Sequence, residues 1–561
     1  MRQKADWRAR WARRLMLSAW RPMRWQRLAL FAAVSVALAA LAMWAAWLKQ
    51  EAASVPLSPV GRLFDLLYAP FTYLVPQATF ALAHTLAWQE GVARILGPLL
   101  PLLGMVWLFR RRMLVGLARL LLAHGAQGHA VILGDRGSAD RLAIASSEKG
   151  EPVLLCDPSA VGDEDRLAQL GAAGVVVLGA PPADLRHCSS IATWSNGDAE
   201  NLAGAIALRG QGRIGERDLL FAQHSPDAHR ALLQAPDLAL DGQVRLRPIS
   251  LVGDALRRAL GQPDNLARAL ARGQRRVTLC LWGDGDGIAW AAEMALRQFW
   301  SVQLGAPHVY CVAEGSASQI ETEGLSRFAR HAPDVFAPQD LPRWQSLSRA
   351  EAACDRAVTL HLVDAGNDDE TVAICFSLAG RLRQESSDPP PVQAILRGAG
   401  DLACLFRSEA LHFLPPILLE ERLAIDVLQD RGLEEAAAQL HLAYDREFGG
   451  GGTSPASGRW QELPETYVAA NRAAADHIKI KVWDAQTSGF ADEALVEALA
   501  RIEHDRWCAE RLLNGWIPAH DGQRDNRRRF HPDLRPWSAL DEATREKDRA
   551  QVRAVISVAQ V

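Results

Sequence analysis

The feature that most constrains this chain is a run of 21 residues without a charge, LALFAAVSVALAALAMWAAWL, from Leu28 to Leu48. As a helix rising about 1.5 Å per residue, the run would be about 30 Å long, which is the thickness of the hydrocarbon core of a bilayer. It therefore predicts a transmembrane helix close to the N-terminus.

A second apolar run extends from Val92 to Phe109, although Arg94 and two prolines interrupt it. Nine basic residues and one acid precede the first run, and the basic stretch Arg110–Met113 follows the second. Because basic flanks favour the cytoplasmic side, we expect a transmembrane hairpin with both ends in the cytoplasm. A cleaved signal peptide is the alternative, but the basic region is too long and no small-residue cleavage site follows.

The segment between the two runs, residues 61–88, is apolar and aromatic, and Pro70 and Pro76 break it into short pieces. A re-entrant hairpin that lines a pore and a lipid-facing loop are both compatible with it. It contains no sequence like TVGYG, so potassium selectivity is not supported. Tryptophans alternate with arginines before the first run, as is typical of the lipid headgroup layer: Trp7, Trp11, Trp20 and Trp25.

Composition bounds the remainder of the chain. A length of 561 residues predicts three or four domains, and a net charge of −3 argues against a polycation that coats nucleic acid. The eight cysteines are scattered singly without a CxxC pair, which is typical of reduced cytosolic thiols and predicts neither disulfides nor a metal site. No GxxxxGK[ST], HExxH or GxSxG motif is present, and we expect no enzymatic activity.

Beyond the apolar runs the chain alternates strands with helices, and the alternation occurs twice. HAVILG and PVLLCD begin the first series, and RVTLCLW and HVYCVAE begin the second. The segment SIATWSNGDAEN, from Ser190, corresponds to TLHLVDAGNDDE, from Thr359, and DLLFAQH corresponds to PVQAILR. The pattern predicts an internal duplication with two tandem doubly wound parallel sheets.

Both halves resemble the RCK or TrkA-N family, Rossmann-type regulatory domains of ion channels and transporters that bind nucleotides. In the first half, Gly134 and Gly137 lie in the glycine turn, and Asp157 ends the second strand. In the second half, Gly283 and Gly285 take the first and second glycine positions of the turn, and Glu314 lies at the end of the second strand. The resemblance implies NAD or another nucleotide as the cofactor.

The glycine turns depart from the G-x-G-x-x-G pattern of that family. Arg136 takes the second glycine position of the first turn, and Ile288 replaces the last glycine of the second. Asp135, Asp284 and Asp286 bring negative charge close to a phosphate site. Two interpretations stay open: nucleotide binding, or a purely structural and dimer-forming role.

The C-terminal region contains the stretch EHDRWCAERLLNGW, from Glu503 to Trp516. Glu503, Arg506 and Trp507 fall on one face of a helix, and Gly515 offers the left-handed conformation that ends helices. Further along the chain, HPDLRPW is an extended segment fixed by prolines. These motifs resemble the RyR domain, named after ryanodine receptors, and the resemblance implies a small helical sensor or interaction module.

Tryptophan faces can stack on flat rings, and arginine side chains bind phosphate oxygens in pairs, so a nucleotide-type ligand would suit this region. The alternative is that the tryptophans form the core of a small domain. The candidate ligand-binding residues are Arg472, His477, Glu503, His504, Arg506, Trp507, Trp516, His531 and Trp537.

The sequence thus predicts an α/β protein with N-terminal transmembrane helices and a small helical C-terminal domain. Its predicted parts are a basic cytoplasmic segment (1–27), a transmembrane hairpin (28–112), two Rossmann-type domains (128–262 and 273–440), a flexible linker (449–458) and a RyR domain (459–561).

The functional hypothesis is a homo-oligomeric, multi-pass protein of the bacterial inner membrane whose soluble domains lie in the cytoplasm. Its expected partners are the lipid bilayer and a small nucleotide-type ligand, with no nucleic acid. It is either a ligand-gated channel or membrane-disrupting effector, as in phage defence, or a membrane-tethered scaffold without channel activity.

Overall fold

The computed structural model describes most of the chain beyond residue 98. The described residues are 6–20, 37, 44, 99–123, 126–210, 214–215, 217–235, 240–241, 244–312, 322–354, 357–398, 400–407, 411–448 and 459–559. The segment 61–88, the linker 449–458, Trp25, Glu314 and nearly all of the run 28–48 lie outside them. Within the described part, no helix combines the length and the apolar character that crossing a membrane requires.

The first Rossmann-type half is built on a seven-stranded sheet with the order β3-β2-β1-β4-β5-β7-β6. All neighbouring strands are parallel except the short β6, which pairs antiparallel with β7 at the edge. The strands are β1 (Ala130–Leu133), β2 (Val153–Cys156), β3 (Val176–Leu178), β4 (Ser190–Thr193), β5 (Arg217–Ala222), β6 (Leu240–Asp241) and β7 (Val244–Ile249). The helices between them are α6 (Ser138–Glu148), α7 (Glu164–Ala172), α8 (Asp198–Gly210) and α9 (Pro226–Leu233).

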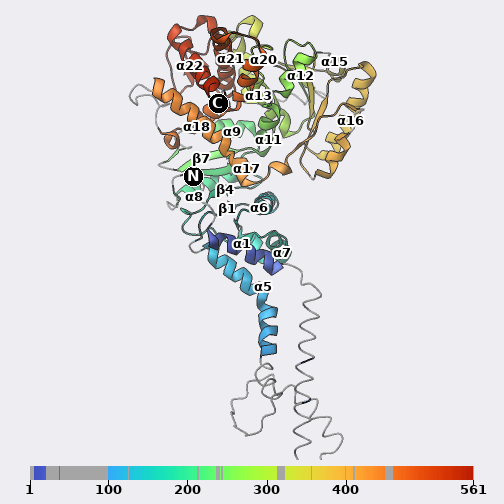
Figure 1. Ribbon diagram of the computed structural model, residues 1–561, viewed down its shortest axis with the longest axis vertical. Helices are drawn as coiled ribbons and strands as arrows, with labels where there is room; N and C mark the ends of the chain where they lie inside the picture. Colours follow the sequence, from blue (N-terminus) through green and yellow to red (C-terminus); the bar gives the residue numbers. More distant parts are fainter. Residues whose placement is uncertain are drawn as a thin grey trace, which may run out of the picture.

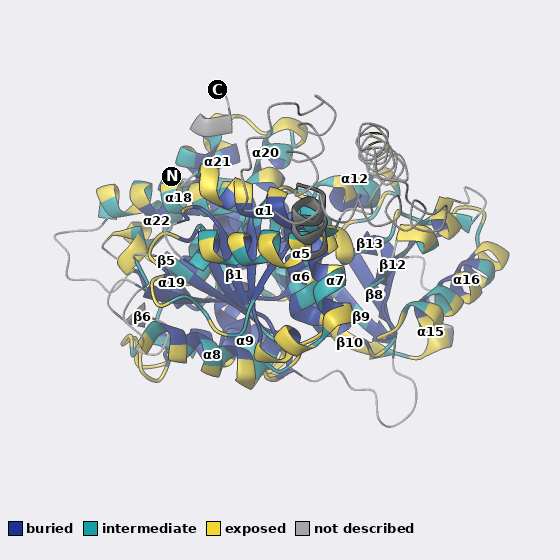
Figure 2. Cartoon of the chain, turned by 90° about the horizontal axis from the view of Figure 1, so that it is seen from below, coloured by how far each residue is buried: buried dark blue, intermediate teal, exposed yellow. Residues whose placement is uncertain are grey.

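The second half repeats this topology in a six-stranded, fully parallel sheet with the order β10-β9-β8-β11-β12-β13. Its strands are β8 (Thr278–Trp282), β9 (His308–Val312), β10 (Arg343–Leu347), β11 (Leu360–Val363), β12 (Val392–Leu396) and β13 (Ile417–Leu418). Its helices are α13 (Asp286–Gln298), α14 (Glu323–Val335), α15 (Arg349–Cys354) and α16 (Asp368–Glu385). The prediction of two doubly wound parallel sheets is confirmed, and the central strands form the buried layer in Figure 2.

The two halves exchange elements across their boundary. Helices α11 (Leu251–Leu260) and α12 (Asp264–Ala271) follow the first sheet in the chain, but Leu256 and Leu266 are buried in the core of the second. Conversely, the segment after the second sheet returns to the first, where Ile425 of α17 (Ile425–Gln429) packs against the strands. Each half therefore completes the hydrophobic core of the other.

Two N-terminal helices lie below the first sheet at the lower end of the described structure (Figure 1). α1 (Trp7–Trp20) packs along the C-terminal half of α5 (Leu99–Ala123), and both join the core of the first half. α5 continues without a break through Arg110–Met113, the stretch expected to follow a membrane span. Trp7 and Trp11 are exposed, whereas Trp20 is partly buried against this core.

The C-terminal region is helical. α18 (Arg431–Phe448) packs with α19 (Glu465–Asp476) and α22 (Glu542–Ala559), and α20 (Ile478–Thr487) and the long α21 (Asp492–Leu513) complete the group. The short strands β14 (Ile517–Pro518) and β15 (Phe530–His531) pair in parallel between α21 and α22. Gly515 has a φ of 93° directly after α21, which confirms the predicted helix stop.

Candidate functional site

A cavity of about 200 Å³ lies between α19, α21, α22 and the segment around β15. Five of the predicted ligand-binding residues line it: Glu503, His504, Arg506, Trp507 and His531. The first four come from consecutive turns of α21, whereas His531 comes from β15, so the fold brings together residues that the sequence separates.

A buried ion cluster forms the floor of this cavity. The carboxylate of Glu503 accepts hydrogen bonds from Arg506 Nε at 2.9 Å and Nη2 at 2.8 Å, and Lys481 Nζ lies 2.7 Å from it. Burial would raise the pKa of Glu503, but the charges of Arg506 and Lys481 outweigh burial and hold it far below its ordinary value. Burial lowers the pKa of Lys481, but the charge of Glu503 opposes this shift. The buried carboxylate of Glu503 thus joins Lys481 of α20 to Arg506 of α21.

His504 is held by two acceptors. Its Nε2 lies 2.9 Å from the carbonyl oxygen of Arg535, and its Nδ1 lies 3.4 Å from Asp548 Oδ2. Burial alone would lower the pKa of His504, but interactions with Cys508 and Asp548 raise it well above the ordinary value. With an acceptor at each nitrogen, the imidazole ties α21 to α22 and to the segment that contains Arg535.

Aromatic rings form one wall of the cavity. The rings of Trp507 and His531 meet edge to face at 5.0 Å, and Trp507 stacks with His504 at 5.8 Å. Burial and nearby arginines lower the pKa of His531 to about 2, and its Nδ1 accepts the backbone N–H of Asp533. His531 is therefore neutral, and this wall offers apolar ring surfaces to a planar group.

Three cations at the cavity, which we did not predict, are Arg511, Arg524 and Lys547. The guanidinium carbon of Arg511 lies 5.6 Å from the Trp507 ring, and its Nη1 is buried without a hydrogen-bond partner, although its Nε lies 3.5 Å from Glu510. Lys547 makes no ion pair within the described part of the chain. Arg511 stands one turn after Trp507 on α21, which is the one signal in the sequence that pointed to it.

The other predicted ligand-binding residues do not line this cavity, although Trp516, Trp537 and His477 each contact a residue that does. Trp516 is buried in the core shared with the second sheet, Trp537 packs beside α21 and α22, and the buried His477 contacts the carbonyl oxygen of Trp300 at 2.9 Å. Arg472 lines a separate cavity of about 140 Å³ between the two Rossmann-type halves and the C-terminal helices, where it pairs with Glu434 and Glu465.

The first glycine turn is filled by side chains of the protein. Arg166 is buried and binds Asp140, in the first turn of α6, at 2.7 Å and 2.8 Å. The same guanidinium lies 2.7 Å from the carboxylate of Asp157, one of the residues on which the nucleotide-binding resemblance rests. Arg136, which takes the second glycine position, is mostly exposed and pairs with Asp163. Gly134 is required by a close approach of β4, because a Cβ there would lie 2.0 Å from the Trp194 carbonyl oxygen.

The second glycine turn holds a carboxylate of its own. Asp364, at the end of β11, accepts the backbone N–H of Gly287 at 2.8 Å and is bound by Arg397. A Cβ on Gly285 would lie 2.3 Å from the Asp364 carboxyl carbon. Helix N-termini in this position bind phosphate in Rossmann folds, so Asp364 occupies the place of the anion at the start of α13.

Within the described ranges, no group of three histidine, cysteine, aspartate or glutamate side chains is placed to hold a metal ion.

Comparison with known protein families matches residues 490–561 to the RyR domain. The resemblance is thus confirmed for α21, the β14–β15 pair and α22, which carry most of the cavity wall.

Among solved structures, the chain is similar to a crystal structure of a GsuK mutant, with 16% identity, a TM-score of 0.32, and coverage of 72% of this chain and 96% of that one. The structure of GsuK bound to ADP has 16% identity and a TM-score of 0.31, and the match covers 71% of this chain and 96% of that one. The structure of the GsuK channel bound to NAD has 12% identity and a TM-score of 0.35, with coverage of 74% of this chain and 85% of that one. TM-scores of this size carry no functional argument.

Proposed function

We propose that the protein is a ligand-responsive membrane protein in which the cavity lined by Trp507, Arg511 and His531, here called the RyR cavity, binds a nucleotide-type ligand. Binding alters how the two Rossmann-type halves sit on the N-terminal helices, and an oligomer of the chain responds by opening a pore or disturbing the bilayer. The proposal assigns the chain no catalytic step.

The observation that carries this proposal is the pairing of ring surfaces with cations in one cavity. Trp507 and Tyr467 offer faces to a base, and Arg511, Arg524 and Lys547 offer charge to phosphate oxygens. The buried carboxylate of Glu503 is neutralised by its own cations, so it does not cancel this positive field. A planar anion fits that arrangement.

A physical connection supports the coupling to the Rossmann-type halves. The carbonyl oxygens at the end of α21 accept hydrogen bonds from arginines of three elements. Arg230 of α9 binds Leu513 at 2.6 Å, Arg327 of α14 binds Gly515 at 2.8 Å, and Arg529 of the β14–β15 segment binds Asn514 at 3.1 Å. Since α21 also carries Trp507, a ligand that displaces α21 acts on both halves, provided that it favours one arrangement over the other.

Ligand binding is tested by calorimetric titration of the full chain in detergent with ATP, ADP, NAD and a cyclic dinucleotide. We expect one of these to bind, and Arg524→Gln and Lys547→Gln each to weaken it about tenfold, since one charge-assisted hydrogen bond is lost. Arg527→Gln is the matched control, because Arg527 is exposed in the same loop but does not line the cavity. Equal losses in all three variants would contradict the assignment.

Channel activity is tested with the same chain in planar bilayers. A ligand-dependent current that Arg524→Gln reduces, and Arg527→Gln does not, is the expected result. Ligand binding without any current would replace the channel with a membrane-tethered scaffold.

A further inference from the structure

A second cavity lies between α1, α5 and α7. These helices lie towards the lower end of the described structure in Figure 1. It measures about 450 Å³, more than twice the size of the RyR cavity. Its lining includes Trp20 from α1, Arg111, Arg112 and Arg119 from α5, and Glu164 from α7.

The charge of this cavity is strongly unbalanced. Three arginines face one acid, Glu164, and within the described residues none of the three guanidinium groups forms an ion pair with a carboxylate. Nε of Arg119 is buried without a hydrogen-bond partner. Arg111 lies over the Trp20 ring, with its guanidinium carbon 3.1 Å from the ring centroid. Clustered, unpaired guanidinium groups in a hollow are the donor set that binds phosphate oxygens.

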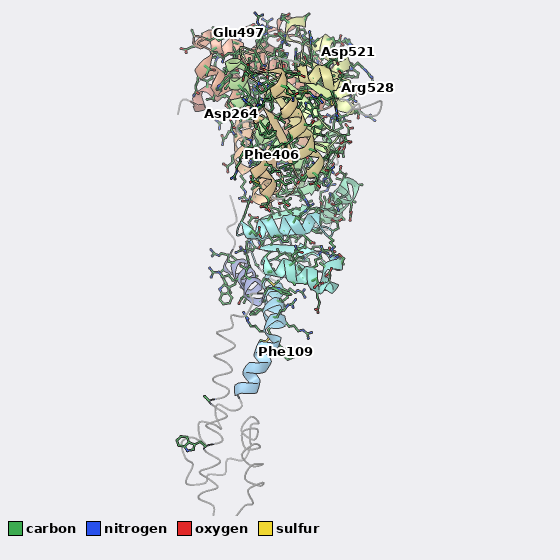
Figure 3. The ribbon with its side chains drawn as sticks, turned by 90° about the vertical axis from the view of Figure 1, so that its right-hand side faces the viewer. Phe109, Asp264, Phe406, Glu497, Asp521 and Arg528 are labelled. Atoms are coloured by element: carbon green, nitrogen blue, oxygen red, sulfur yellow. The ribbon has the colours of Figure 1, made fainter. Side chains whose placement is uncertain are left out.

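An exposed apolar stripe runs along α5 beside this cavity. Phe109, Met113, Leu117 and Leu120 are 43%, 57%, 46% and 59% exposed, and their spacing of 4, 4 and 3 residues places them on one face of the helix. At 3.6 residues per turn this face adjoins the one that carries Arg112 and Arg119. Phe109 projects from α5 below the folded domains in Figure 3. A free anion would use only the arginines, whereas a lipid with an anionic headgroup would use both the arginines and the apolar stripe. The arrangement therefore matches such a lipid better.

We propose that this cavity binds the phosphate group of an anionic phospholipid, held by Arg111, Arg112 and Arg119, while an acyl chain lies along the exposed stripe of α5. The lipid would then link the membrane surface to α7 and the first sheet. The identification of the ligand as a lipid rests on the membrane attachment in the proposed function. The assignment of a phosphate site to these arginines does not depend on that attachment.

The test uses the full chain in a neutral detergent and native mass spectrometry. Phosphatidylglycerol, phosphatidylcholine and free glycerol phosphate are titrated separately. We expect phosphatidylglycerol to bind at least tenfold more tightly than phosphatidylcholine. The triple variant Arg111→Gln, Arg112→Gln, Arg119→Gln should lose at least tenfold of this affinity. The single variant Arg119→Lys, which retains the charge but loses the planar fork, should lose an intermediate amount even if the triple variant folds poorly.

The matched control is the double variant Arg10→Gln, Arg14→Gln. Both arginines are exposed on α1 and outside the cavity, so the control removes charge from the same helix pair. Glycerol phosphate binding as tightly as phosphatidylglycerol would retain the phosphate site and assign it to a soluble anion. Absence of binding by both, or an equal loss in the control, would overturn the proposal. Neither nucleotide nor current is measured, so this outcome is independent of the RyR cavity.

Discussion

Burial changes the pKa of individual carboxyl groups on α21, and Asp505 is the clearest case. Asp505 neighbours His504 in the chain but is packed away from the cavity, and burial raises the pKa of its carboxyl group to about 7. The charges of Asp340 and Asp548 raise this pKa further, while His504 and Arg501 oppose them. The folded protein therefore holds a proton on Asp505 that the unfolded chain releases near pH 4.

This displaced pKa predicts a pH dependence. Because the folded pKa is raised, the stability that protonated Asp505 contributes is fully present below about pH 4 and is lost as the pH rises towards 7. We expect the midpoint of thermal unfolding to fall less between pH 5 and pH 8 in Asp505→Asn than in the unmodified protein. Asp521→Asn, in the exposed loop labelled in Figure 3, is the control and should leave the profile unchanged.

The Glu503 cluster predicts a loss of stability. Glu503→Gln leaves Arg506 and Lys481 buried without their shared anion, and removing one partner of such a pair costs about 3–5 kcal/mol. Denaturant unfolding of the full chain measures the change. The double variant Glu503→Gln, Lys481→Met should recover part of the loss, because one stranded charge is removed. A cost below about 1 kcal/mol for Glu503→Gln would contradict the prediction that this carboxylate stabilises the two buried cations.

At the scale of elements, the glycine turn before α13 illustrates what the sequence predicted and what it did not. The strand, the turn and the helix were predicted and are confirmed. Asp364 belongs to the end of β11, far along the chain from this turn, so its carboxylate at the start of α13 could not be read from the turn itself. The absent side chains of Gly285 and Gly287 allow the Asp364 carboxylate to approach the backbone, as they would allow a phosphate to do.

This packing makes Gly287 sensitive to a single methyl group. A Cβ at Gly287 would lie 2.4 Å from Asp364 Oδ2 and 2.9 Å from Ile395 Cδ1. Gly287→Ala should therefore cost about 1–3 kcal/mol, the usual cost of overpacking. Gly380→Ala in α16 is the control, since nothing lies within 4 Å of its Cβ, and it should be neutral or stabilise by up to about 1 kcal/mol. The measurement is the midpoint of thermal unfolding, which should fall in Gly287→Ala and stay unchanged or rise in Gly380→Ala.

At the scale of the whole molecule, the halves are interdependent although each has its own sheet. The apolar faces of α11 and α12 belong to the second core, and Leu423, Ile425 and Leu428 belong to the first. Polar contacts also hold α11 against the segment around α17. Arg257 of α11 forms an ion pair with Asp430 at 2.6 Å, and Arg258 donates a hydrogen bond to the carbonyl oxygen of Val427.

The exchange predicts that the first half does not fold alone. A fragment of residues 128–272 would expose Leu256 and Leu266 and lack Ile425, so we expect it to aggregate or to be cleaved rapidly by a protease. A fragment of residues 128–561 retains both cores and should resist cleavage. Limited proteolysis of the two fragments under the same conditions is the measurement. A soluble, protease-resistant 128–272 fragment would contradict the exchange.

The sequence by itself determined the two parallel sheets and the RyR signature, because hydrophobic periodicity and helix-stop residues are local properties of the chain. It did not show β7, whose Arg245 and Arg247 are buried only because Asp218 and Glu434 neutralise them. Nor did it show that the cations of the RyR cavity are Arg511, Arg524 and Lys547, or that Asp364 fills the second glycine turn. These features depend on which side chains meet across tens to hundreds of residues, and only the tertiary structure decides that.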